Sequence, residues 1–322
     1  MKLPKIILAP LAGYTNSAFR RICNELGIKL TYSEMVSVKG LYYDSIRTKE
    51  LCYIDELEND VCIQLFGGEV EDFIKGANVI KDLNYFSLDV NAGCPVKKVL
   101  KTGGGSRLLE DLDKLKEIIY QLKLISKKYV SVKIRAGLNK SSISIPQTIK
   151  KCEEAGVDFI AVHGRCASDL YKGCVNLDYI KLAKEVASVP IIGNGDIRSI
   201  DDAINMFNYT KCDSIMVGRG ALTNPFLLRD LIEYFENGNN IRKEIKVSDR
   251  LNLIMKHIEY LSEIKPEKIV ILEMKSIANF YLKHVNNCKE YKVNIVKSKN
   301  INELIGIIDS MRKLNENHWN GN

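Results

Sequence analysis

The chain has nine cysteines among its 322 residues but no Cys-x-x-Cys pair, and the cysteines are scattered along its length. This spacing provides neither the framework of a small disulfide-rich protein nor the paired ligands of a zinc site. Cysteines used in this way are typical of a reducing compartment. We therefore expect a cytoplasmic protein that holds no metal ion.

Long hydrophobic runs are also missing. No apolar stretch approaches the roughly 20 residues that a helix needs to cross a bilayer. The apolar run at residues 6–9 superficially resembles a signal peptide, but it is short and is broken by Pro10, so we interpret it as a buried strand. We expect no membrane segment, and the sequence contains no internal repeat and no low-complexity tract.

The charge is ordinary in amount and uneven in distribution. Charged residues make up 27% of the chain, and the formal net charge is +7. Residues 241–322 contain 15 lysines and arginines against 10 acidic residues, whereas residues 1–240 contain 32 against 30. A basic excess of this size hints at a polyanionic partner, but on charge alone solubility explains it equally well.

Short apolar runs alternate with helical patterns over the first 236 residues. The expected strands are residues 6–9, 30–33, 61–66, 85–90, 130–134, 159–163, 190–193 and 214–218. The expected helices are residues 16–26, 69–82, 112–126, 146–155, 177–187, 200–209 and 226–236. The strands are almost continuously apolar, as expected for parallel strands buried on both faces. Eight such units predict an α/β protein, a (β/α)8 TIM barrel; an open doubly wound sheet would have fewer strands and a GxGxxG after the first.

A turn at residues 237–240 separates this region from a different pattern. Beyond it only helical patterns follow, at residues 250–264, 266–285 and 301–313. The sequence thus predicts a catalytic barrel at residues 1–240 and a small all-helical domain at residues 241–322. We expect the protein to be a monomer.

Polar residues stand where the apolar strands end. Gln64, Lys133, His163 and Asn194 each occupy the carboxyl end of an expected strand. In a barrel of this type the active site forms at those ends, so a polar ligand is expected there. The turns after the last two strands contain Asn194, Gly195, Asp196, Gly218 and Arg219. Barrels often bind phosphate in this region, although ordinary turn chemistry also favours these residues.

Eight segments in order resemble the tRNA-dihydrouridine synthase family, especially its bacterial B-type branch. They are LAPLAGYTNSAFR (8–20), SEM (33–35), QLFGG (64–68), LDVNAGCPVKKVLKTGGGSRLL (88–109), VKIRAGL (132–138), VHGR (162–165), IIGNGDI (191–197) and VGRGALTNPFL (217–227). The resemblance implies an enzyme that reduces the 5,6 double bond of specific uridines in tRNA, expected in the D-loop. It also implies FMN as the bound cofactor and NADPH, or NADH, as the electron donor.

The resemblance assigns roles to particular residues. Cys94 is the implied general acid, because a mostly protonated thiol can supply the proton that a reduced uracil needs. Lys133 would hold the N1–C2 edge of the flavin, where negative charge develops on reduction. The other implied FMN contacts are Pro10, Leu11, Ala12, Gln64, His163, Asn194, Gly195, Asp196, Gly218 and Arg219. A basic loop at residues 97–101, with Arg107, could guide the tRNA backbone.

The chain departs from the family pattern in two places, and two other functions remain open. Cys166 and Ala167 replace a Thr-Arg pair, and residues 275–277 replace an Arg-Lys-His segment, which leaves the tRNA contacts open. The alternative activity is that of an FMN-dependent barrel oxidoreductase acting on a free small molecule such as a pyrimidine or an enone. A further alternative is an RNA-binding protein with a vestigial barrel.

Overall fold

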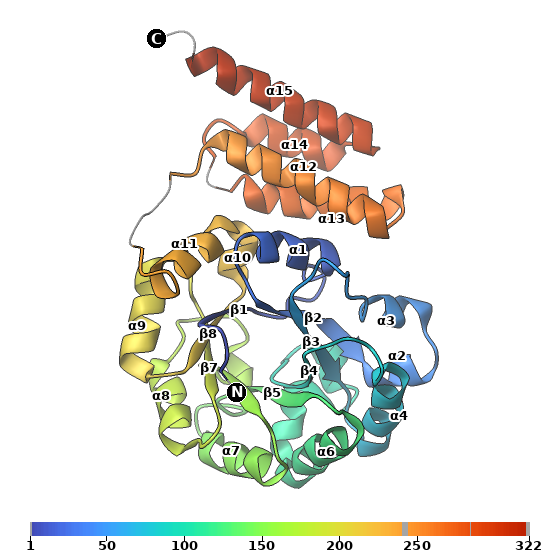
Figure 1. Ribbon diagram of the computed structural model, residues 1–322, viewed down its shortest axis with the longest axis vertical. Helices are drawn as coiled ribbons and strands as arrows, with labels where there is room; N and C mark the ends of the chain where they lie inside the picture. Colours follow the sequence, from blue (N-terminus) through green and yellow to red (C-terminus); the bar gives the residue numbers. More distant parts are fainter. Residues whose placement is uncertain (1, 240–243, 284, 320–322) are drawn as a thin grey trace.

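Eight parallel strands form the centre of the computed structural model, which describes residues 2–239, 244–283 and 285–319 (Figure 1). Their bounds are β1 Ile6–Leu8, β2 Leu30–Ser37, β3 Asp60–Phe66, β4 Ser87–Ala92, β5 Tyr129–Arg135, β6 Phe159–His163, β7 Ile191–Asn194 and β8 Ser214–Val217. Each strand pairs in parallel with its sequence neighbour from β2 to β8, and β8 pairs with β1. The result is a nearly closed (β/α)8 barrel, as the sequence predicts.

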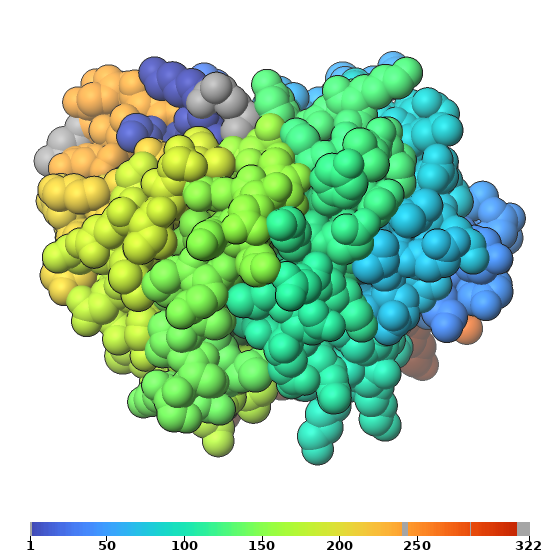
Figure 2. Space-filling model, turned by 90° about the horizontal axis from the view of Figure 1, so that it is seen from below, coloured from blue at the N-terminus to red at the C-terminus, as the bar shows by residue number. Residues whose placement is uncertain are grey.

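Helices surround this barrel. The ring comprises α1 Ser17–Glu25, α4 Val70–Ile80, α6 Leu112–Ile125, α7 Ile145–Glu154, α8 Leu177–Val186, α9 Ile200–Thr210, α10 Arg219–Thr223 and α11 Phe226–Phe235. Several begin at a residue whose side chain accepts a backbone N–H, among them Asn16, Asp111 and Ser199. The face turned away from the C-terminal helices is covered mostly by the central part of the chain, coloured cyan to yellow in Figure 2.

The expected strands and long barrel helices are all present, with small shifts at their ends. One expectation is corrected: the second strand does not end at residue 33, because β2 continues to Ser37 through a register shift between Tyr32 and Met35 and so includes Glu34 and Met35. In two of the connections between strands, β2–β3 and β4–β5, the structure has short helices that the sequence did not predict. They are α2 Val38–Tyr42, α3 Ile46–Glu50 and α5 Lys97–Leu100.

Side chains alternate between the two sides of the barrel wall. On β4, Leu88 and Val90 belong to the large apolar core between strands and helices, whereas the intervening residue Asp89 does not. A second, smaller apolar cluster plugs the barrel interior and includes Ile7, Tyr32, Cys62, Phe159, Ile192 and Met216. The interior is therefore a packed plug, and polar side chains follow it toward the carboxyl ends of the strands.

Four C-terminal helices of the described residues lie on one side of the barrel (Figure 1). These are α12 Val247–Ile264, α13 Glu267–Tyr281, α14 Lys289–Lys297 and α15 Ile301–Trp319. Helix α12 packs against α1 and α13 against α10, while α15 lies farthest from the barrel. The ring of His257 stacks on Phe19 of α1 with centroids 5.9 Å apart, and Arg250 donates a 2.9 Å hydrogen bond to the carbonyl of Tyr281. The boundary predicted between residues 240 and 241 lies outside the described residues.

None of the helices in the described part of the chain combines the length and the apolar character needed to cross a membrane.

Candidate active site

The polar residues predicted from the strand ends do gather at one end of the barrel. Gln64 is paired in register with Asp89, Asn91 with Lys133, and His163 with Asn194. Because the strands are parallel and neighbouring, in-register residues lie side by side on the same face of the sheet. The barrel mouth therefore collects Gln64, Lys133, His163 and Asn194 from β3, β5, β6 and β7.

A chain of buried hydrogen bonds crosses β3, β4 and β5. The carboxylate of Asp89 accepts hydrogen bonds from Gln64 Nε2 and Ser131 Oγ, each 2.7 Å long. The Gln64 amide oxygen in turn accepts from Asn91 Nδ2 at 2.8 Å. Burial raises the pKa of Asp89 to about 6, although these hydrogen bonds and the Lys133 charge oppose the shift. Asp89 and Asn91 were not among the predicted site residues. A carboxylate within an apolar strand, however, is a signal that could have identified Asp89 as one.

Cys94 lies on the loop that follows β4, and this loop is held at both sides. The Cys94 N–H donates a 2.9 Å hydrogen bond to Asn91 Oδ1, and the Cys94 carbonyl accepts from the Ser106 N–H at 3.0 Å. Gly105 has φ +64°, and a Cβ there would lie 2.4 Å from the Cys94 oxygen, so only glycine fits. The thiol is half-buried, and burial raises its pKa, with the Val96 backbone and nearby Arg135 and Lys133 opposing.

Lys133 presents a cation in the barrel mouth without an acidic partner. Its Nζ donates a 2.8 Å hydrogen bond to Asn194 Oδ1, and Asn194 Nδ2 donates to the Met216 carbonyl at 2.8 Å. Within residues 2–239, 244–283 and 285–319, no carboxylate lies at ion-pair distance from Lys133. Burial, with a further contribution from Arg135, lowers the pKa of Lys133 to about 8. A half-buried cation without a carboxylate partner is costly, so this position is suited to an anionic group of a ligand.

Asp196, predicted from its turn after β7, lies at the centre of an arginine cluster. Its carboxylate accepts from Arg165 at 2.5 Å and from Arg219 at 3.1 Å, with Arg198 at 3.4 Å. Burial raises the pKa of Asp196, but the Arg165 hydrogen bond, the Val175 N–H and the nearby guanidinium charges outweigh it and leave the pKa below its usual value. Asp196 therefore orients the arginines, and the guanidiniums remain the groups suited to an anion.

His163 joins this cluster through Arg165. The Arg165 guanidinium is only 1% exposed and lies 3.2 Å from His163 Nε2. Burial, with the charges of Lys133 and Arg135 beside it, holds the pKa of His163 well below its usual range. The imidazole is therefore neutral at physiological pH and can serve as a hydrogen-bonding group but not as a cation.

The turns after β1, β7 and β8 approach one another. A Cβ added to Gly218 would lie 3.6 Å from a Leu11 methyl carbon, in ordinary contact. Leu11 is held in a tight turn, since its N–H donates to Thr15 Oγ1 at 3.0 Å and its carbonyl accepts the N–H of Thr15 at 3.0 Å. Gly195 has φ +139°, which other residues rarely adopt. Pro10 and Leu11 are half-buried here, whereas Ala12 is exposed.

Tyr171 lies between two arginines at the edge of the mouth. The Arg135 guanidinium lies 5.5 Å and the Arg219 guanidinium 5.2 Å from the centre of its ring, within cation–π distance. Arg135 is 3% exposed and also donates a 2.7 Å hydrogen bond to the Cys166 carbonyl. Neither Tyr171 nor Arg135 was predicted as a site residue, because the contact joins the end of β5 to a loop that is distant in the sequence.

The C-terminal helices reach the mouth through α13. Glu273 accepts from Asn16 Nδ2 at 3.0 Å and pairs with Lys265 at 2.6 Å. The ring of Phe280 meets Tyr14 edge-on, with centroids 5.7 Å apart. Asn16 and Tyr14 belong to the loop after β1, which also holds Leu11. The C-terminal helices thus border the same opening as the catalytic candidates.

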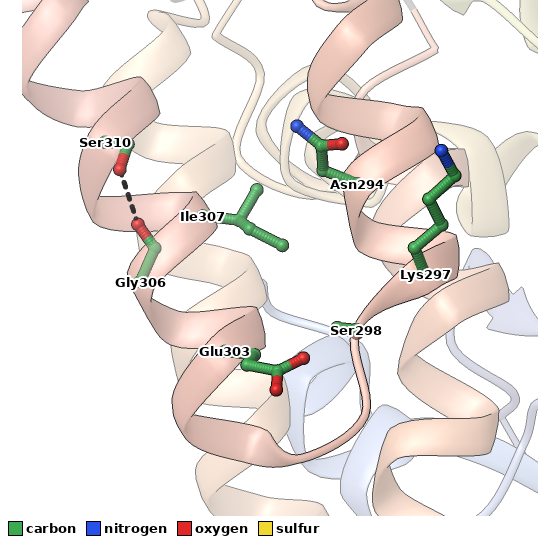
Figure 3. Close-up of a pocket in the computed structure, with 7 residues that line it drawn as sticks. All are labelled: Asn294, Lys297, Ser298, Glu303, Gly306, Ile307 and Ser310. Carbon is green, nitrogen blue, oxygen red and sulfur yellow. Dashed lines mark hydrogen bonds between the residues drawn. The ribbon is translucent and has the colours of Figure 1, made fainter.

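The described part of the chain contains two hollows. One, of about 380 Å³, borders the arginine cluster and is lined in part by Cys174, Val175, Asp196 and Arg198. The other, of about 340 Å³, lies between α14 and α15, where Figure 3 shows Ile307 pointing between the two helices. Only residues from Asn294 to Ser310 line this second hollow, so it is separate from the strand ends.

Comparison with known proteins gives a consistent result. The model of the family described as dihydrouridine synthase (Dus) matches residues 7–313. A probable tRNA-dihydrouridine synthase of Aquifex aeolicus is 36% identical over 316 residues, which are 97% of this chain and 97% of that protein. tRNA-dihydrouridine synthase B of Pasteurella multocida is 34% identical over 259 residues, 80% of this chain and 78% of its own.

Solved structures resemble the chain in fold. Histamine dehydrogenase from Rhizobium sp. 4-9 superposes with a TM-score of 0.55 at 13% identity, covering 80% of this chain. The chain spans about half of that larger protein, 49% of its length. TcOYE, solved with pHBA, superposes with a TM-score of 0.53 at 12% identity. The superposition covers 76% of this chain and 91% of TcOYE. At such identities the likeness concerns the barrel alone.

Proposed function

Because the chain belongs to the dihydrouridine synthase family, we propose that it reduces the 5,6 double bond of specific uridines in tRNA. The proposal includes FMN as bound cofactor, NADPH as electron donor and uridines of the D-loop as targets. One observation carries it: a half-buried thiol, Cys94, lies beside a mouth that contains the unpaired cation Lys133. A packed barrel without such chemistry would have apolar residues at these positions.

The residues at the mouth fit a flavin. Gln64 uses one N–H and one lone pair within the buried chain, so its amide retains one donor and one acceptor for a ligand. Lys133 would stand at the edge where a reduced isoalloxazine becomes negative. The backbone at Gly195 and Gly218, together with Arg219, would receive the phosphate, since glycines allow close approach and a guanidinium forms paired hydrogen bonds. Pro10, Leu11 and Ala12 would border the ring, with His163 as a neutral hydrogen-bonding group.

When bound, the flavin supplies the hydride that reduction of the uracil C6 requires. This chain supplies the proton for C5 from Cys94. Burial keeps the Cys94 pKa above its ordinary value, so the thiol is protonated at neutral pH and can donate. The Cys94 loop, fixed by Asn91 and Ser106, keeps the thiol at the mouth instead of exposing it to solvent.

The tRNA is proposed to bind across both parts of the chain, residues 1–240 and 241–322. Lys97, Lys98, Lys101 and Arg107 are exposed on the loop that follows Cys94. The basic C-terminal helices border the same opening, and Lys283 is exposed near it while Lys275 is half-buried. Phosphates attracted by these groups would direct a target base, turned out of its stack, into the mouth.

The test uses the purified protein, an unmodified tRNA transcript, FMN and NADPH. We expect NADPH oxidation to depend on the tRNA, and dihydrouridine to appear at defined positions of the transcript by mass spectrometry. Free uracil and a simple enone, assayed in parallel, should turn over slowly or not at all. Rapid turnover of a free pyrimidine or enone with none on tRNA would instead identify an oxidoreductase of small molecules.

A further inference from the structure

Asp89 has no part in the proposed chemistry, yet it is a carboxylate with no solvent exposure inside the barrel. Its strand neighbours in register are Gln64 on β3 and Ser131 on β5, and both donate hydrogen bonds to it. Burying a carboxylate is unfavourable unless its oxygens are hydrogen-bonded, and an apolar residue would fill this space without that cost. The position of Asp89 therefore calls for an explanation beyond packing.

The Asp89 carboxylate determines which groups of its neighbours donate hydrogen bonds and which accept them. An ionised carboxylate can only accept, so Gln64 must turn its NH2 group toward Asp89 and its oxygen toward Asn91. Asn91 must then turn its NH2 group toward Gln64, which leaves Asn91 Oδ1 facing the loop. That oxygen accepts the N–H of Cys94 at 2.9 Å and the N–H of Gly93 at 3.3 Å. The orientation of the Gln64 amide thus determines the orientation of the Asn91 amide.

We propose that Asp89 is a positioning residue whose ionised carboxylate sets the orientation of the Gln64 and Asn91 amides and thereby holds the Cys94 loop in place. The proposal rests on the proposed function only for the role of Cys94 as proton donor. It also sets which donor and which acceptor of Gln64 remain for the flavin.

The charge of Asp89 depends on the groups that face it. Tyr32 from β2, Cys62 from β3 and Lys133 from β5 surround it, together with Gln64 and Ser131. Its pKa is raised to about 6, so the carboxylate is mostly ionised at pH 7.5 and becomes protonated as the pH falls below about 6. A protonated Asp89 can donate, and the direction of the chain is then no longer imposed.

The test exchanges charge between two neighbours. In Asp89→Asn, the side chain can offer either an NH2 group or an oxygen to Gln64, so the direction is undetermined. In the double variant Asp89→Asn with Gln64→Glu, the new amide at position 89 donates to the new carboxylate at position 64. Ser131 still donates to the amide oxygen at position 89, and the second carboxylate oxygen at position 64 accepts from Asn91. The double variant therefore reverses the hydrogen bond between positions 64 and 89 but again presents only an acceptor to Asn91, which restores the wild-type orientation of the Asn91 amide.

The readout is the rate at which iodoacetamide alkylates Cys94 in the full-length protein, before and after removal of bound flavin. Peptide mass spectrometry follows Cys94, and the exposed Cys174 serves as the internal control. At pH 7.5 we expect iodoacetamide to alkylate Cys94 about threefold to tenfold faster in Asp89→Asn than in the wild type. This range corresponds to the free energy of one neutral hydrogen bond. The double variant should return to within about twofold of the wild type, and Cys174 should not change.

Folding is checked by far-UV circular dichroism and thermal unfolding. If Asp89→Asn does not fold while the double variant folds with wild-type Cys94 reactivity, the rescue supports the proposal. Wild-type reactivity in Asp89→Asn, or a double variant no better than the single one, overturns it. The rate is measured without tRNA, so its outcome is independent of whether the protein acts on tRNA.

Discussion

The ammonium of Lys133 lies 2.8 Å from the Asn194 side-chain oxygen, and burial lowers its pKa to about 8. If this cation binds the flavin, Lys133→Met should weaken FMN binding about tenfold or more, the effect of losing a hydrogen bond to a charged group. Fluorescence titration of FMN measures the affinity. Lys101→Met, which removes an exposed lysine, is the matched control and should bind FMN normally.

The same lysine predicts that the affinity for FMN depends on pH. As the pH rises through about 8, Lys133 loses its proton, so the wild-type affinity for FMN should fall between pH 7 and 9.5. Arg135, Asp89 and Cys94 are the other charged or titratable groups that act on it. Lys133→Met should lack this decline. An unchanged decline in the variant would show that another group causes it.

Asp196 should matter for stability because it neutralises Arg165, which is 1% exposed. Asp196→Asn is expected to lower the free energy of unfolding by about 2–4 kcal/mol, near the lower part of the range for breaking a buried pair. Urea unfolding at pH 7 measures the loss. Asp113→Asn, at an exposed pair with Lys151, is the control and should change little. Equal stabilities of the two variants would contradict the proposed importance of this pair.

His257 predicts that the contact between the C-terminal helices and α1 is sensitive to acid. It is completely buried, its Nδ1 lies 2.9 Å from the Tyr281 hydroxyl, and burial lowers its pKa to about 3. The unfolded chain takes up a proton near pH 6.5, whereas the folded protein does so only near pH 3. The contribution of the neutral His257 to the free energy of unfolding is therefore complete above pH 6.5 and is lost as the pH falls toward 3.

The variant that isolates this effect is His257→Phe, which preserves a ring next to Phe19. At neutral pH it should lose about 1–3 kcal/mol, because the Tyr281 hydroxyl loses its partner. Between pH 6.5 and 4, however, its stability should fall less steeply than that of the wild type, by up to about 1.4 kcal/mol per pH unit. Identical slopes in urea unfolding would remove His257 as the source.

The sequence predicts the barrel well because its pattern is local. Nearly continuous apolar runs and the polar residue at each strand end suffice to place Gln64, Lys133 and His163 at one mouth. The resemblance to the dihydrouridine synthase family is confirmed by the match over residues 7–313. Successive side chains of a strand alternate between the two faces of the barrel wall, so these polar side chains point inward where their apolar neighbours point toward the helices.

Contacts between distant loops could not be predicted in the same way. Arg165 was not among the predicted site residues, but its buried guanidinium contacts both His163 and Asp196. The contact of Tyr171 with Arg135 and Arg219 depends on how the loop that contains Tyr171 folds over the end of β5 and the start of α10. The extension of β2 to Ser37 was missed because Glu34 interrupts the apolar pattern, and its carboxylate instead accepts the N–H of Gly13.

Cys94 gives a prediction about which step is affected. Cys94→Ala should slow uridine reduction about 10²- to 10⁴-fold, the range for a lost general acid, while flavin reduction by NADPH stays within about twofold. Because burial raises the Cys94 pKa, the alkaline fall in wild-type turnover should come at a higher pH than the ionisation of an ordinary thiol. Stopped-flow absorbance separates the two steps. Cys174→Ala is the control, and unimpaired uridine reduction in Cys94→Ala would remove that thiol from the mechanism.

The central claim is that this chain makes dihydrouridine in tRNA, and mapping that base in cellular tRNA tests it most directly. Total tRNA would be mapped position by position in a strain lacking the gene, and again after restoring the wild-type chain or Cys94→Ala. We predict that dihydrouridine disappears from defined positions, returns with the wild-type chain and does not return with Cys94→Ala. A full complement of dihydrouridine in the strain without the gene would contradict the claim.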